Sequence, residues 1–91
     1  MAEILIVEDE INISNLIKMA LSQHGHKTNC VFDGESCADI LEKKHFDLVL
    51  LDVMLPKISG FELMDYIKSF DTPVIFITAK ADVSNKVYGL N

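Results

Sequence analysis

Three carboxylates follow directly after apolar runs of the chain. Glu8 and Asp9 come after the run at 3–7, and Asp52 comes after the unbroken apolar run at 48–51. If the two runs are neighbouring strands, the three side chains converge, and their mutual repulsion calls for a cation or a proton. Carboxylate oxygens in small number are ligands that suit Mg²⁺. The spacing therefore predicts a magnesium site.

Asp52 is also a candidate nucleophile. A carboxylate held beside Mg²⁺ can attack phosphorus and form an aspartyl phosphate. That reaction needs donors for the phosphoryl oxygens. Thr78 ends the apolar run at 74–78 and offers a hydroxyl, with the backbone N–H of Ala79 next to it. Any one of these residues alone would be an ordinary strand-end side chain, so the hypothesis depends on their joint positions.

Strands and helices are expected to alternate along the chain. Four strands are predicted at 3–7, 27–32, 46–51 and 74–78. Apolar residues at helical spacing predict four helices, with these buried stripes: Ile13, Leu16, Ile17, Ala20 and Leu21; Cys37, Ala38, Ile40 and Leu41; Leu63, Met64, Ile67 and Phe70; Val83, Val87 and Leu90. Such alternation indicates a parallel α/β sheet with helices on both faces. In such sheets, ligands bind at the carboxyl ends of the strands, where these side chains stand.

Smaller signals set the details of this prediction. Gly25 is expected to end the first helix, and the Asp-Gly pair at 33–34 to form a turn. Ser59 and Glu62 have the spacing of a capping box for the third helix. The run at 48–51 shows no alternation, which predicts a strand buried on both faces.

Composition excludes several classes of protein. The net charge is −6 with only 8 Lys and Arg residues, which argues against nucleic-acid binding by this segment. No apolar run approaches the roughly 20 residues of a membrane span. Cys30 and Cys37 are seven residues apart with no CxxC spacing, so reduced thiols are expected. We expect a soluble cytoplasmic domain.

The motifs ILIVEDE, DLVLLDVMLPKISGFEL and PVIFITA, in this order and spacing, resemble the receiver domain of bacterial two-component response regulators. The resemblance covers all 91 residues. It implies a flavodoxin-like, doubly wound parallel sheet with strand order 2-1-3-4-5. It also implies a signalling phosphoacceptor rather than a turnover enzyme, in which Asp52 receives phosphoryl from a sensor histidine kinase.

The resemblance further implies roles for single residues. Asp9 and Asp52 would bind Mg²⁺ directly and Glu8 through water, with the backbone carbonyl of Met54 as another ligand. Thr78 would be the switch hydroxyl that turns toward the phosphoryl group. The phosphoryl oxygens would also accept from two backbone N–H groups, those of Val53 and Ala79.

The chain departs from the family pattern at three places, one of which is Ser59, where Asp or Asn is common. Glu8 stands where the family often has Asp. The family's fifth strand, with its lysine and aromatic switch residue, and its fifth helix are absent after Asn91. Lys80 and Tyr88 do not replace these residues, because they fall in the loop after the fourth strand and on the last helix. We therefore expect a truncated receiver domain over 1–91, with sheet order 2-1-3-4.

The truncation has consequences for behaviour and for partners. We expect weak phosphorylation of the chain alone, because the ammonium of the lysine is missing. We also expect that the chain is not a well-behaved monomer, because an apolar edge strand is a template for pairing. It should dimerise through the strand-four edge or the helix-four face, exchange elements with a second copy, or be poorly ordered after about Lys80. The spacing DVMLPKISGFELMDYIKS most resembles regulators with a C-terminal DNA-binding output domain, which implies transcription control by the full-length protein.

Three alternative functions compete with this one. A haloacid-dehalogenase-like phosphatase needs D-x-D, and Met54 stands at the second Asp position. A flavin or nucleotide carrier needs a phosphate-binding loop, and EDEINISN contains no glycine. An inert receiver that serves only as a protein-interaction module stays open.

Overall fold

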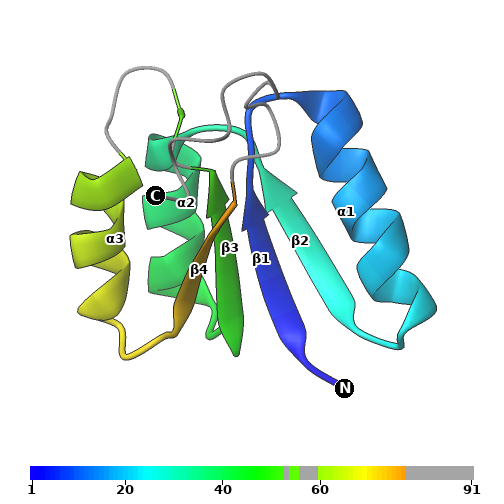
Figure 1. Ribbon diagram of the computed structural model, residues 1–91. Helices are drawn as coiled ribbons and strands as arrows, with labels where there is room; N and C mark the ends of the chain where they lie inside the picture. Colours follow the sequence, from blue (N-terminus) through cyan, green and yellow to red (C-terminus); the bar gives the residue numbers. More distant parts are fainter. Residues whose placement is uncertain (53, 56–59, 78–91) are drawn as a thin grey trace, which may run out of the picture.

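The computed structural model describes residues 1–52, 54–55 and 60–77. In this part of the chain, four strands alternate with three helices: β1 (Glu3–Val7), α1 (Ile11–Gln23), β2 (Lys27–Val31), α2 (Gly34–Lys43), β3 (Leu48–Asp52), α3 (Gly60–Lys68) and β4 (Val74–Ile77). The strands form one parallel sheet in the order β2-β1-β3-β4 (Figure 1). The predicted α/β sheet with strand order 2-1-3-4 is confirmed. The last predicted helix and the Ser59 cap lie outside the described residues.

The main core lies between the sheet and the helix pair α2 and α3. In the register of β1 and β3, Leu5 is opposite Val49 and Val7 is opposite Leu51, so these four side chains share one face. The core cluster consists of Leu5, Val7, Cys37, Leu41, Phe46, Val49, Leu51, Leu55, Leu63 and Ile67. Figure 1 shows α2 and α3 on one side of the sheet and α1 on the other. Helices therefore cover both faces, as predicted.

The second face of the sheet is covered less completely. Leu48 and Leu50 of β3 are half-buried, and Ile75 of β4, which pairs with Leu50, is 52% exposed. The prediction that the 48–51 run is fully buried on both faces is therefore wrong. The physical reason is the position of α1, which packs against β2 and β1 rather than over β3 and β4.

α1 turns only part of the predicted stripe toward the sheet, and Ile13 is among the predicted residues that are half-buried. Ser14 is fully buried, with Ile17 and Leu21 half-buried at the i+3 and i+7 positions. Leu16 is 65% exposed and Ala20 is also exposed, so their assignment to the core is wrong. The helix carries apolar residues on both sides, and only contact with the strands decides which side is buried.

The helix boundaries follow local hydrogen-bonding chemistry. The Asp33 side chain caps α2 by accepting from the Ser36 N–H at 2.7 Å, so the Asp-Gly pair begins a helix instead of forming a separate turn. Gly25 has a φ of +83°, the left-handed conformation expected where a helix ends. Within the described residues, no helix is long and apolar enough to cross a membrane.

Cys37 is expected to resist alkylation in the native protein. The residue is fully buried, and burial together with the nearby charge of Asp33 raises the pKa of its thiol to about 12. The thiolate is the nucleophile, so the protonated, inaccessible thiol is unreactive. With iodoacetamide in mildly alkaline buffer, we expect label at half-buried Cys30 before Cys37, and label on both free cysteines in denaturant. Faster native labelling of Cys37 than of Cys30 would contradict the packing of α2.

Candidate metal centre

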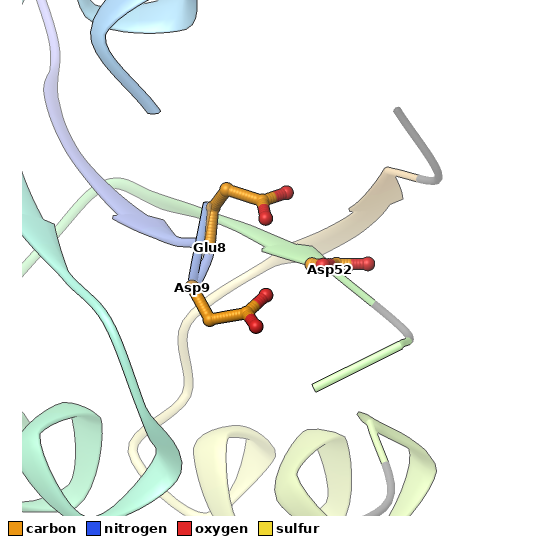
Figure 2. A group of neighbouring side chains, drawn as sticks. All are labelled: Glu8, Asp9 and Asp52. Carbon is orange, nitrogen blue, oxygen red and sulfur yellow. The ribbon is translucent and has the colours of Figure 1, made fainter. Parts of the chain in front are cut away.

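Three carboxylates meet at the carboxyl ends of β1 and β3. Glu8 and Asp9 follow β1 directly, and Asp52 is the last residue of β3, its strand neighbour in the sheet. Each residue offers one oxygen to a group whose members all lie within 4.8 Å of one another. Figure 2 shows the three carboxylates projecting from these adjacent strand ends toward the same side. The predicted convergence of these side chains is therefore present in the structure.

Two of the three carboxylates are removed from solvent. Glu8 and Asp52 are 0% exposed, whereas Asp9 is in contact with solvent. The Glu8 Oε2 accepts a hydrogen bond from the Glu10 backbone N–H at 2.9 Å, and the Asp52 Oδ1 accepts one from the Met54 backbone N–H at 2.9 Å. Hydrogen bonds to charged groups offset part of the cost of burying the charge. Each buried carboxylate is thus held by the amide two residues further along the chain.

The cluster fits a hard divalent cation. Two unit charges 4.8 Å apart repel by about 3–4 kcal/mol at an effective dielectric constant near 20. Three ionised carboxylates so close together require compensation. The donor set consists of carboxylate oxygens, which are preferred ligands of Mg²⁺, and this ion keeps several waters when a protein supplies few ligands. The residues present therefore fit the magnesium site that the sequence predicts.

The other predicted site residues fall into two groups. Val53, Thr78 and Ala79 lie outside the described residues, and their phosphoryl-binding roles stay predictions. Met54 is among the described residues. It is 57% exposed, and its backbone N–H donates a hydrogen bond to the Asp52 carboxylate. The metal-binding role of its carbonyl stays a prediction. The sequence did not indicate the two hydrogen bonds from the amides of Glu10 and Met54, because a backbone donor has no signature in residue type.

Neutralising one member of the cluster is expected to stabilise the protein in the absence of cation. Asp9→Asn keeps the shape of the side chain and removes one of the mutually repelling charges. We expect the free energy of unfolding in chelator to rise by about 1–2 kcal/mol, measured by urea denaturation. Added Mg²⁺ should then stabilise the unmodified protein more than the variant. Asp39→Asn, at an exposed position on α2, is the control and should change little. Loss of stability in Asp9→Asn, with an undiminished response to Mg²⁺, would contradict the repulsion argument.

Comparison with known proteins agrees with this geometry. The family model of the response regulator receiver domain matches residues 4–91. The response regulator ArlR of Staphylococcus aureus is 39% identical over 92 residues, an alignment that covers 100% of this chain and 42% of ArlR. The chain thus spans about two fifths of the length of the curated relatives it matches.

Solved structures of one regulator from Thermotoga maritima are similar as well. TrrA in complex with Mg²⁺-BeF has a TM-score of 0.81 and 33% sequence identity, and the match covers 99% of this chain and 80% of that one. TrrA in complex with the histidine kinase ThkA has a TM-score of 0.81 and 32% identity, covering 99% of this chain and 79% of that one. By family match, sequence identity and fold, this chain belongs to the response regulator receiver domains of two-component systems.

Proposed function

We propose that this chain is a phosphoacceptor in which Asp52 receives a phosphoryl group from a histidine of a sensor kinase. The observation that carries the proposal is the position of Asp52, fully buried at the end of β3, with one carboxylate oxygen each of Glu8 and Asp9 within 4.8 Å of one of its own. The complex of TrrA with ThkA supports the kinase as donor, and the complex of TrrA with Mg²⁺-BeF supports the cation. The residues proposed to hold Mg²⁺ are Glu8, Asp9 and Asp52, with the carbonyl of Met54.

The proposed step is a displacement at phosphorus. An oxygen of the Asp52 carboxylate donates an electron pair and forms the new O–P bond. The P–N bond to the kinase imidazole breaks, and the nitrogen keeps the electron pair and takes a proton from solvent. The Met54 N–H donates a hydrogen bond to Asp52 Oδ1. We therefore assign the attack on phosphorus to the other oxygen, the buried Oδ2. When bound, Mg²⁺ would offset the repulsion between the carboxylate and the phosphoryl oxygens.

The proposed product supports a role as a switch rather than as a turnover enzyme. The phosphoryl group ends on the protein itself, so the chain acts on its own side chain. Thr78 is proposed to turn its hydroxyl toward the acyl phosphate, and the N–H groups of Val53 and Ala79 are proposed to donate to the remaining phosphoryl oxygens. A change at Thr78 would alter the surface that follows β4, which a partner or an output domain could read.

The test of this function is labelling with a small phosphodonor. Because the chain covers only about 80% of the TrrA structure, the experiment uses the chain extended to receiver length, with the 91-residue chain alongside. Acetyl phosphate and Mg²⁺ should add one phosphoryl group by intact mass. The label should disappear in chelator and be released by base or hydroxylamine, as for an acyl phosphate. A label that forms in chelator or survives base would contradict an aspartyl phosphate.

The same proposal includes an output domain and a cellular location. The curated relatives are longer than this chain, which covers 42% of ArlR, and we assign the additional length to an output domain that binds DNA and controls transcription. The segment described here has an acidic balance and is not proposed to contact nucleic acid itself. Free thiols at Cys30 and Cys37 support a cytoplasmic location.

We further propose a dimer through the strand-four edge. β4 is the outer strand of the described sheet, and its Ile75, on the face that α1 leaves uncovered, is 52% exposed beside this edge. Ile75→Lys is expected to shift the protein toward monomer in light scattering at several concentrations. Leu16→Lys on α1, at a residue that is 65% exposed, is the matched control and should leave the association unchanged. Equal effects of the two variants would argue against this edge. The helix-four face lies outside the described residues.

A further inference from the structure

The amide of Glu10 holds one oxygen of Glu8, one of the two fully buried members of the acidic cluster. Its N–H donates to Glu8 Oε2 at 2.9 Å, and the Glu8 side chain is 0% exposed. The second oxygen, Oε1, is buried as well. Asp52 repeats the arrangement with the amide of Met54, so each buried carboxylate is bonded to the backbone two residues ahead.

This amide is suited to fixing a side chain. Glu10 is the N-cap residue of α1, and its carbonyl accepts the Ser14 N–H at 3.0 Å, which ties the residue to the first turn of the helix. The N–H of an N-cap residue takes no part in the hydrogen-bond ladder of its helix. The Glu10 N–H can therefore donate to Glu8 without the loss of any hydrogen bond within α1. Its position changes only if the start of the helix moves.

Glu8 needs such support more than an aspartate would. A glutamate has one more rotatable bond than an aspartate, and fixing a glutamate side chain costs up to about 2 kcal/mol of conformational entropy. Because a hydrogen bond already fixes one carboxylate oxygen, the conformational entropy of the Glu8 side chain is lost on folding and not when a cation binds. Groups that orient metal ligands in this way typically change metal affinity by about 10–100-fold when removed.

We propose that the backbone amide of Glu10 is a positioning group for the cation site: it holds Glu8 Oε2 and so keeps Oε1 directed to the pocket that Asp9 and Asp52 share. This inference rests on the proposed function, because it concerns the cation which that function requires. It assigns a role to a residue whose own side chain is exposed and is not part of the acidic cluster.

The test removes the N–H of residue 10 and leaves the three carboxylates in place. Glu10 has a φ of −87°, about 20° from the value that proline imposes, so Glu10→Pro requires only a small adjustment of the local backbone. Glu10→Ala is the matched control, because it removes the side chain and keeps the amide. Titration of the protein with Mg²⁺, followed by NMR, should show affinity about 10-fold weaker in Glu10→Pro and changed by less than about twofold in Glu10→Ala.

A double-mutant cycle separates positioning from a general disturbance. Proline also restricts the residue before it, here Asp9, which belongs to the cluster. If the amide acts through Glu8, then Glu10→Pro should cause almost no further loss of Mg²⁺ affinity in a Glu8→Ala background. The same loss in both backgrounds would mean that proline acts on Asp9 or on the fold, and would overturn the inference.

The outcomes distinguish this inference from the proposed function. If the unmodified protein binds no Mg²⁺, the proposed function fails. If it binds Mg²⁺ and Glu10→Pro binds as tightly as Glu10→Ala, only the positioning role fails. Should Glu10→Pro not fold, the Glu10 amide resonance decides: Mg²⁺ must shift it in the unmodified protein, and Glu8→Ala must abolish that shift. A resonance that does not respond would overturn the inference.

Discussion

Asp52→Asn is expected to abolish phosphoryl labelling by acetyl phosphate and Mg²⁺ in the chain extended to receiver length. An amide is not a nucleophile toward phosphorus under these conditions, so the label should fall to background rather than to an intermediate level. Asparagine keeps the oxygen that accepts from the Met54 N–H, so the end of β3 should hold its conformation. Intact mass measured over a time course is the readout.

The control for this variant is Asp39→Asn, which removes an exposed carboxylate from α2. It should be labelled at the same rate as the unmodified chain. Persistent labelling of Asp52→Asn would place the nucleophile at another residue. A loss of labelling in Asp39→Asn as well would show that the variants act through the fold and not through the reaction.

Among the substitutions proposed for this chain, Phe46→Ala is expected to lower the free energy of unfolding most. Phe46 is 0% exposed and lies in the core between the sheet and the helices α2 and α3. It is the largest fully buried side chain among the described residues. Truncating a buried phenylalanine costs about 3–5 kcal/mol, from lost transfer free energy and from the cavity left behind. Domains of this kind have a total free energy of unfolding of only about 5–15 kcal/mol. The variant should therefore unfold at a much lower urea concentration, and part of it could be unfolded without denaturant.

Phe32→Ala is the matched control for this effect. Phe32 follows β2 and is 40% exposed, so its truncation should cost less than about 1 kcal/mol. Urea midpoints at constant m-value measure both changes. Equal losses in the two variants would contradict the position of Phe46 in the core.

The arrangement of elements was predictable because strands and helices differ in period. The apolar runs at 3–7 and 74–77 carry no helical spacing, and they form β1 and β4. The buried face of α1 was not predictable in the same way. Leu16 and Ile17 are both apolar, and the choice between them depends on which side meets β1 and β2, a tertiary contact that no local pattern contains.

The acidic cluster was predictable for a topological reason. Parallel strands end at the same edge of a sheet, so carboxylates after two strands meet once the strands are neighbours. Glu8, Asp9 and Asp52 do meet there. The hydrogen bonds that hold Glu8 and Asp52 could not be predicted, because their donors are backbone amides, which every residue except proline possesses.

The most direct test of the phosphoacceptor assignment is the position of the label within the chain. Cleavage after lysine releases the peptide 45–57, which contains two carboxylates, Asp47 and Asp52. Asp47 lies at the other end of β3, where its side chain accepts from the Glu3 N–H at 2.8 Å. Borohydride reduction of the acyl phosphate marks the labelled aspartate as homoserine, and fragment masses then separate the two positions. We predict the mark at residue 52 with residue 47 unchanged; a mark at residue 47, or one outside this peptide, would contradict the assignment.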